Sequence, residues 1–189
     1  MAQFRQAFGI TSTHEGGYVD DPDDRGGETY RGISRKHHPD WAGWALVDGF
    51  KSHPTFPANI DDGALDASVE AFYKSLYWNP FQGDDISSQL IANELFDSGV
   101  NMGVTRAVHF LQEALNLLNR NGNSWVEIAE DGDFGKNTMK ALNAALSRDE
   151  MSLFNLMNVL QGMHYIALMR KSPVQEKYAR GWFKRVRTA

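Results

Sequence analysis

The sequence predicts an α+β fold that is mainly α. Apolar residues recur at helical spacing along most of the 189 residues. One segment, 18–33, instead combines β-forming residues with a dense cluster of Asp and Gly. The chain is 42% hydrophobic and 23% charged and has no cysteine, so we expect a core that forms without disulfides and no thiolate chemistry.

The first predicted helix covers residues 3–15. Its apolar face consists of Phe4, Ala7, Phe8 and Thr11. Gly16 and Gly17 supply a stop, so Glu15 is expected at the C-terminal end of this helix. The small β-hairpin lobe follows at 18–33, around Pro22. No other segment has a convincing strand pattern.

The rest of the chain is expected to be helical. A short helix ends near Gly49, residues 52–60 form a loop, and Asp61 or Asp62 caps a helix that runs to Trp78. The apolar face of that helix is expected to be Leu65, Val69, Phe72, Tyr73 and Leu76. Further helices are predicted at 87–98, 104–119, 135–146, 149–171 and 174–186, with a surface turn at 119–122.

Residues 150–169 are apolar nearly all round, which predicts a central buried helix. Its methionines and His164 then fill the core rather than hold a cofactor. The net charge of −5 argues against a nucleic-acid partner. Residues 170–189 carry seven Lys or Arg against Glu176 alone. This basic end is either the solvated face of the last helix or a contact for an anionic surface or polymer.

The segment 14–33 carries the candidate chemistry. Two carboxylates in different environments are what glycoside hydrolysis requires. A position at the C-terminal end of a helix is expected to disfavour an ionised Glu15, but the dipole contributes only about 0.3 to 1 kcal/mol. A proton donor would therefore need apolar neighbours, and Phe8, Tyr18 and Trp78 are candidates. Alternatively, Glu15 is an exposed helix-end acid, and the Asp cluster is a solvated or calcium-binding turn.

The run Glu15-Gly-Gly-Tyr18, followed by Asp24-x-Gly-Gly-x-Thr29-x-x-Gly-Ile33, resembles the signature of the glycoside hydrolase family 108 muramidases. These are bacterial and prophage enzymes that cut peptidoglycan. The resemblance implies a lysozyme-like fold and makes Glu15 the catalytic acid. The order of the three residues is also similar to that of phage-type lysozymes, although the spacing between Asp24 and Thr29 is one residue shorter here.

The resemblance continues along most of residues 8–171. Tyr77-Trp78 and Asp97-Ser-Gly-Val-Asn101-Met-Gly are similar to family segments, and 131–138 resembles a turn of peptidoglycan-binding helical modules. That turn can equally be a helix-capping loop that binds no ligand. We expect a muramidase segment at 1–96 and a helical peptidoglycan-binding-like segment at 97–189, packed together in one lysozyme-like unit.

The resemblance implies a mechanism. Glu15 protonates the oxygen between N-acetylmuramic acid and N-acetylglucosamine, while Asp24 and Thr29 hold the attacking water or stabilise charge on the sugar. Substrate contacts are expected from Tyr18, Tyr77, Trp78, Asp97 and Asn101. The sequence leaves retention or inversion at the anomeric carbon open.

Two other functions are considered. A lytic transglycosylase would need only the acid, but its Gly-Leu-Met-Gln motif is absent. A non-catalytic peptidoglycan-binding or secretion-assisting protein would retain a vestigial site. No cofactor or metal is expected, since His14-Glu15 lacks the second histidine of a zinc-protease motif.

The sequence also yields expectations about location. The N-terminus lacks the order of a secretory signal, and no apolar run reaches the roughly eighteen residues of a membrane span. We expect synthesis in the bacterial cytoplasm and bacteriolytic action on the wall in the periplasm. A prophage endolysin of this kind would need a holin or an export partner, and no stable membrane insertion is expected.

Overall fold

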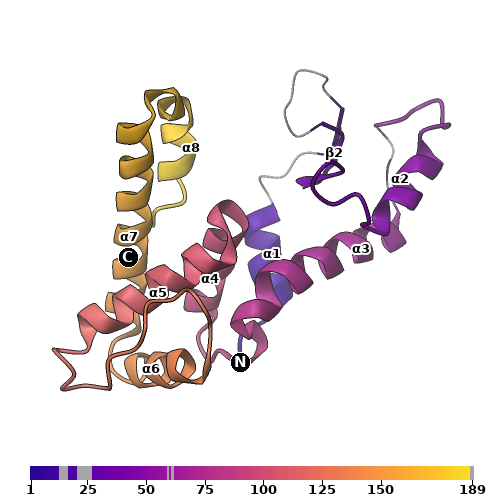
Figure 1. The fold of residues 1–189 in the computed structure, drawn as a ribbon. Coiled ribbons are helices and arrows are strands. Elements are labelled where there is room, and N and C mark those ends of the chain that lie inside the picture. The colour runs from indigo at the N-terminus through magenta and orange to yellow at the C-terminus, as the bar shows by residue number, and fades with distance from the viewer. Residues whose placement is uncertain (13–16, 21–26, 59, 61, 188–189) are drawn as a thin grey trace. The chain divides into compact units, whose positions relative to one another are not determined.

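The computed structural model describes residues 1–12, 17–20, 27–58, 60 and 62–187 (Figure 1). The chain forms two compact units. Residues 8–76 make up the β-lobe unit, and residues 1–7 with 77–189 make up the helical unit. Phe96, near the expected boundary between two functional segments, lies inside a helix of the second unit. That functional division stays a prediction.

The β-lobe unit contains the small sheet that the sequence predicts. Helix α1 (Phe4–Ser12) begins in the helical unit and ends in this one. Strands β1 (Tyr18–Val19), β2 (Thr29–Tyr30) and β3 (Ile33–Ser34) pair antiparallel in that order, with Tyr18 opposite Tyr30. Arg31 and Gly32 have φ of 44° and 78°, the positive values that a tight hairpin turn requires.

Two helices complete this unit, α2 (Gly43–Phe50) and α3 (Gly63–Tyr73). Asp62 caps α3 as predicted, accepting hydrogen bonds from the backbone N–H groups of Ala64 and Leu65 at 2.7 and 3.0 Å. The chain then continues as one π-helical turn, Lys74–Trp78. A π turn changes the angular position of each residue, and Leu76, expected on the buried face, is 41% exposed.

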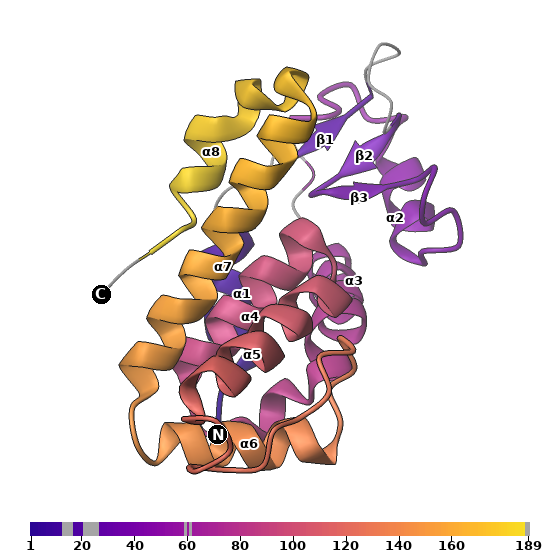
Figure 2. The same cartoon turned by 60° about the vertical axis from the view of Figure 1, so that its left-hand side comes forward.

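The helical unit is built around α4 (Gln89–Met102), α5 (Val104–Leu118) and α7 (Glu150–Lys171), which pack against one another (Figure 2). Ser88 caps α4 through a 3.0 Å hydrogen bond from the Ile91 N–H. Helix α6 (Lys136–Leu146) packs on α5 and α7. The aliphatic core consists of Ile91, Leu95, Val108, Leu111, Leu115, Leu142 and Leu153.

Helix α7 is not buried all round, contrary to the expectation from its sequence. Phe154, Met157 and Leu160 face the core, whereas Val159, Met163 and Ile166 are 45%, 59% and 37% exposed. The other helices cover only part of the α7 surface. Because apolar residues are distributed around the whole helix, the sequence pattern cannot indicate which face is covered. His164 does pack as expected, edge-to-face on Phe110 with centroids 5.7 Å apart.

The C-terminal segment differs from the single helix expected at 174–186. It forms a 3-10 turn at Pro173–Tyr178, and α8 (Ala179–Phe183) follows. Trp182 stacks on Tyr165 of α7, with ring centroids 4.8 Å apart and planes at 14°. The segment is therefore anchored by this aromatic contact rather than by an extended amphipathic face. Within the described residues, no helix is both long and apolar enough to cross a membrane.

Candidate active site

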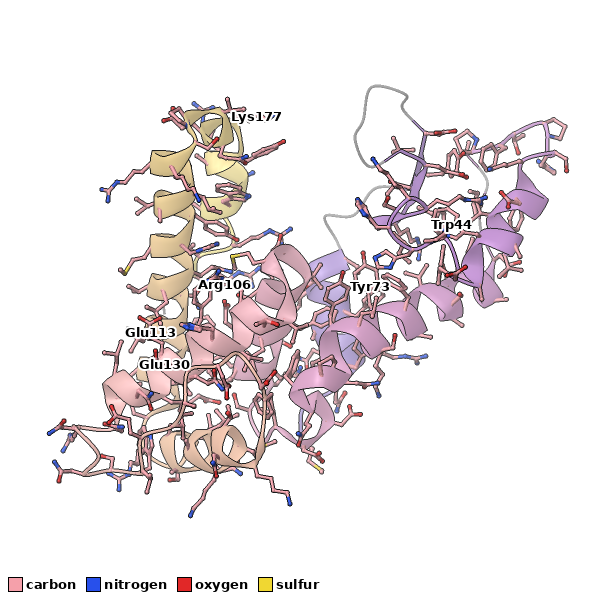
Figure 3. All side chains as sticks on the ribbon, in the orientation of Figure 1. Trp44, Tyr73, Arg106, Glu113, Glu130 and Lys177 are labelled. Carbon is pink, nitrogen blue, oxygen red and sulfur yellow. The ribbon has the colours of Figure 1, made fainter. Side chains whose placement is uncertain are left out.

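A cavity of about 270 Å³ lies at the C-terminal end of α1. Among the described residues, it is lined by Phe8, Ser12, Arg31, Val69 and Tyr73. Tyr73 projects from α3 (Figure 3) and donates a 2.8 Å hydrogen bond to the Arg31 carbonyl. The Arg31 guanidinium pairs with Asp66 at 2.7 Å. The cavity thus combines an aromatic wall with a fixed cation, an arrangement suited to a polar ligand with apolar faces.

The candidate acid and its first partner are carried by the segment that follows α1. Glu15 and Asp24 lie outside the described residues, as does most of the acidic turn considered as a calcium site. Ser12, which lines the cavity, precedes Glu15 by three positions in the sequence. Their roles therefore stay predictions.

Thr29 begins the second strand of the sheet. Its hydroxyl donates a 3.0 Å hydrogen bond to the carbonyl of Gly27, whose φ of 61° places that turn in the left-handed region. Because the Thr29 hydroxyl proton is already donated to Gly27, its oxygen can act only as a hydrogen-bond acceptor toward a ligand or a water.

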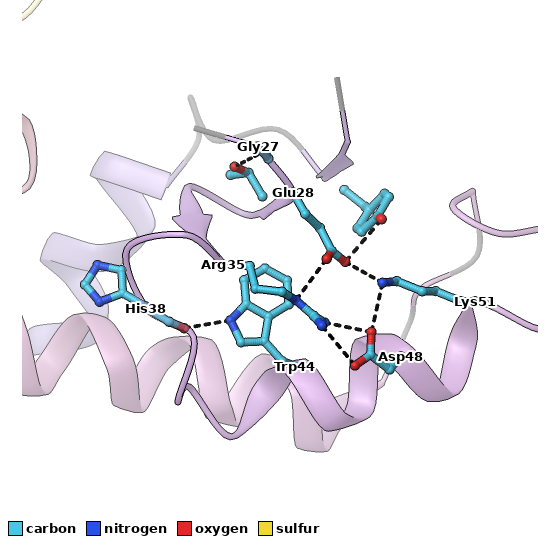
Figure 4. Close-up of polar contacts among 9 residues, drawn as sticks. Gly27, Glu28, Arg35, His38, Trp44, Asp48 and Lys51 are labelled. Atoms are coloured by element: carbon cyan, nitrogen blue, oxygen red, sulfur yellow. Dashed lines mark hydrogen bonds and ion pairs between the residues drawn. The ribbon is translucent and has the colours of Figure 1, made fainter. Parts of the chain in front are cut away.

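A network of charges holds the β-lobe together (Figure 4). Glu28 pairs with Arg35 at 2.9 Å and with Lys51 at 2.7 Å, and it accepts a 3.2 Å hydrogen bond from the Tyr18 hydroxyl. Asp48 accepts two hydrogen bonds from Arg35, at 2.7 and 3.1 Å. The network therefore joins β1, the segment before β2 and helix α2, and it fixes the position of Tyr18.

The pKa values explain why this network persists at neutral pH. Hydrogen bonds from Arg35 and then Lys51 lower the pKa of Asp48 to about 2. Hydrogen bonds to Glu28 and Asp48 raise the pKa of Lys51. Burial, followed by the charge of Glu28, raises the pKa of Tyr18. Asp48 thus stays ionised and Tyr18 stays a donor over the ordinary pH range.

The sequence did not single out Glu28, although it lies between the two motif residues Gly27 and Thr29. Its partners come from positions 18, 35 and 51, so nothing local identifies it. The guanidinium of Arg35 also lies 4.4 Å from the ring of Trp44, which fixes it on a second side.

Trp78, expected to line the substrate groove, is a core residue of the helical unit. It is 0% exposed and packs edge-to-face against Phe4, Phe81 and Phe96. Its indole N–H donates to Asp84 at 2.9 Å, and a Cβ at Gly83 would lie 2.3 Å from its ring. No face of this ring is available to a sugar. Tyr77, its neighbour, is half-buried.

Asp97 and Asn101 lie one turn apart on α4 and interact with each other. The amide of Asn101 donates to the Asp97 carbonyl at 2.7 Å and contacts the Asp97 carboxylate at 3.4 Å. The same carboxylate accepts a 2.7 Å bond from Arg185, 88 residues along the chain. Asp97 therefore positions the exposed Asn101 side chain. The negative charge of Asp97 is paired with the Arg185 guanidinium.

A second carboxyl on α4, Glu94, was missed by the sequence analysis. It is only 6% exposed and accepts a 3.1 Å hydrogen bond from the Ser98 hydroxyl. Burial, together with the nearby charge of Asp97, raises its pKa to about 7. Its helical spacing with Ile91, Leu95 and Ser98 on the buried face is the signal that could have identified it.

The turn that resembles peptidoglycan-binding modules is held by Gln112 of α5. The Gln112 amide donates to the Asp131 carboxylate at 2.9 Å and to the Asp133 carbonyl at 3.0 Å, and it accepts from Gly132 N–H at 2.8 Å. Backbone hydrogen bonding from Asp133 lowers the pKa of Asp131. These polar groups serve the fold, which favours the structural interpretation of this turn.

Comparison with known proteins agrees with this architecture. A model of the family described as Glycosyl hydrolase 108 matches residues 8–103, and one described as Predicted Peptidoglycan domain matches residues 106–187. No relative is found among curated proteins. The structure of Brucella abortus SagA is 24% identical and covers 97% of this chain and 88% of that chain, with a TM-score of 0.60.

The first match spans just over half of the chain, and the likeness to SagA is one of fold. Together they confirm the mainly helical, lysozyme-like fold with a small β lobe. The chain belongs to the glycosyl hydrolase 108 family and is a lysozyme-type glycoside hydrolase whose substrate is peptidoglycan.

Proposed function

We propose that the chain cleaves the β-1,4 bond between N-acetylmuramic acid and N-acetylglucosamine, with Glu15 as the acid that protonates the departing oxygen. The observation that carries the proposal is the cavity at the end of α1. It is lined by Ser12 and Arg31, which flank the segment carrying Glu15 and Asp24 in the sequence. The Glycosyl hydrolase 108 match includes all of these residues.

Asp24 and Thr29 hold the attacking water in this proposal. The Thr29 hydroxyl gives its proton to Gly27, so its oxygen can accept one hydrogen of a water molecule. Asp24 accepts the other hydrogen or stabilises positive charge on the sugar. The Glu28 network keeps β1 and β2 at a fixed separation, and that would preserve the position of Thr29 during the reaction.

Tyr18, Tyr77 and Asn101 are the proposed glycan contacts. The Tyr18 ring is positioned by its hydroxyl bond to Glu28 and by the ring of Phe56, 4.6 Å away. Asp97 contributes by orienting the Asn101 amide. Trp78 is left out of this set because its ring is fully buried.

The test compares Glu15→Gln with Asp20→Asn, a matched removal of an exposed carboxylate in the same lobe. We expect Glu15→Gln to abolish clearing of purified sacculi without changing the melting temperature, because Gln retains the shape and loses the proton. The Asp20→Asn control should retain activity. Clearing by the Glu15→Gln variant would remove the assignment.

Analysis of the products separates the remaining mechanisms. A hydrolase releases reducing muramic acid ends, whereas a lytic transglycosylase releases anhydro-muramyl ends of lower mass. A protein that only binds or assists secretion would sediment with sacculi and release neither. Mass spectrometry of digested sacculi therefore tests the bond, the reaction type and the existence of activity together.

The cellular role proposed here is that of a prophage endolysin, bacteriolytic once it reaches the periplasm with a holin or an export partner. Expression of the chain alone and together with a holin tests this. Lysis should require the holin and should be lost in Glu15→Gln.

A further inference from the structure

Two grooves of similar size adjoin the same tryptophan in the helical unit. The first, about 440 Å³, is bordered by Arg120 and Arg148, and the second, about 460 Å³, by Val126 and Lys140. Ser124 and Trp125 line both. The residues that line them belong to the end of α5, the loop after it, α6 and the start of α7; Figure 1 shows where these elements lie. Thr29, the described member of the residues assigned to catalysis, lines neither groove.

Trp125 is held rigidly between the two grooves. Its indole N–H donates to the Leu115 carbonyl at 3.2 Å, and the Arg148 guanidinium lies 6.0 Å from the ring. Arg148 also donates to the Ser124 hydroxyl at 3.2 Å. The ring is half-buried and keeps some of its surface accessible. A fixed, partly exposed indole can stack on a sugar ring with little loss of conformational entropy.

The first groove carries a net positive charge, with two cations against one acid. Arg120 and Arg148 border it, and its one acid, Asp149, caps α7 by accepting hydrogen bonds from the N–H and hydroxyl of Ser152. Those bonds lower the pKa of Asp149. An anionic ligand would thus meet two guanidinium groups, the side chains best suited to carboxylates.

The second groove is more apolar and carries a separate cation. Val126 is 80% exposed, and Ile128, Ala141 and Ala144 extend the apolar surface beneath it. Lys140 and the acid Glu127 both line this groove. An exposed apolar floor with one cation and one anion beside it suits a short peptide that carries methyl groups and charges of both signs.

We propose that the grooves on both sides of Trp125 bind a muropeptide, with a sugar ring on the indole and carboxylates of the stem peptide on Arg120 and Arg148. Peptidoglycan strands combine amphipathic sugar rings with peptide carboxylates, which matches the pairing of an aromatic ring with two cations. This inference rests on peptidoglycan being the substrate and names a second binding site for it, independent of Glu15. The Predicted Peptidoglycan domain match covers the whole of this surface.

The experiment titrates the full chain with the disaccharide tetrapeptide GlcNAc-MurNAc-tetrapeptide. This probe lacks the MurNAc-to-GlcNAc bond proposed for cleavage, so binding is measured without turnover. The readout is the indole N–H resonance of Trp125, assigned by its loss in Trp125→Phe. We expect this resonance to shift on titration and the affinity to fall about tenfold in Arg148→Gln.

Controls separate the parts of the ligand and the parts of the protein. Arg106→Gln removes a cation of α5 (Figure 3) that is absent from the lining of both grooves, and this variant should bind as the original chain does. A peptide-free N-acetylglucosamine oligomer should bind equally to the chain with Arg148 and to Arg148→Gln. If the Trp125 resonance stays in place while the muropeptide binds elsewhere, or Arg148→Gln binds with unchanged affinity, the proposal is wrong. Failure of Glu15→Gln to abolish clearing would leave this binding result unaffected.

Discussion

The buried carboxyl of Glu94 should make the stability of the helical unit depend on pH. The groups that face it are Ser98 and Asp97 on α4, Asn158 on α7 and Arg187 in the C-terminal segment. Ser98, Asn158 and Arg187 favour the ionised form, whereas burial and the charge of Asp97 oppose it more strongly. The pKa is consequently raised from 4.5 to about 7.

The direction of the effect follows from proton binding. The folded chain holds the Glu94 proton more tightly than the unfolded chain, so this contribution to stability is complete below pH 4.5 and is lost as the pH rises through about 7. Each pKa unit corresponds to about 1.36 kcal/mol. The rise at Glu94 therefore corresponds to a loss on the order of 3 kcal/mol at alkaline pH.

The variant Glu94→Gln keeps the shape of the protonated acid and cannot ionise. We expect its free energy of unfolding to match that of the original chain at pH 4.5 and to exceed it by about 1 to 3 kcal/mol at pH 8. Urea unfolding, followed by circular dichroism at several pH values, measures both. Taking the difference between the two proteins at each pH cancels the contributions of other titrating groups.

Glu113→Gln is the matched control, because Glu113 lies on α5 with about a third of its side chain exposed and pairs with His109 at only 3.8 Å. It should change stability by no more than about 0.5 kcal/mol at any pH. A constant difference between the original chain and Glu94→Gln from pH 4.5 to 8 would refute the reasoning. It would mean that the buried carboxyl is accommodated equally well in both charge states.

Two further predictions concern the networks that hold the two units. Glu28→Gln should lower the free energy of unfolding of the β-lobe unit by about 1 to 3 kcal/mol, because Arg35 and Lys51 lose a partly buried anion. Thermal unfolding measures this change. An unchanged melting temperature would show that the remaining ion pairs of Asp48 suffice. Gln112→Ala should cost about 1 to 3 kcal/mol because Gly132 and Asp133 lose their partners. Hydrogen exchange at residues 131–138 should rise, and unchanged protection there would contradict the role given to Gln112.

Local signals in the sequence predicted the elements well. The Asp62 cap, the turn at 119–122 and the starts of α6 and α7 each depend on a few adjacent residues, and the structure confirms them. The β lobe was predicted for the same reason, from its cluster of turn residues. The misplaced face of Leu76 arises from the π turn, which alters the helical period that the prediction assumed.

Burial was harder to predict because it depends on what covers a surface. Residues 150–169 have the pattern of a fully buried helix, yet part of the α7 surface is exposed. Trp78 is of a residue type that stacks on sugar rings, but its side chain is fully buried in the core. Similarly, Asp97 has the appearance of a ligand contact, and its partner Arg185 lies too far along the chain for any local pattern to indicate.

The pair formed by Asp97 and Arg185 has a structural consequence for the two matched segments. Asp97 belongs to the Glycosyl hydrolase 108 match and Arg185 to the Predicted Peptidoglycan domain match, yet both lie in the helical unit. Helix α4 of the first segment packs on α5 and α7 of the second, and the buried Ser98 accepts a 2.9 Å bond from Gln161. The boundary between the two matches therefore crosses one hydrophobic core. Separating the two segments would expose that core, so we expect them to fold together. The proposed muropeptide site beside Trp125 and the residue Asn101 therefore belong to the same folded unit.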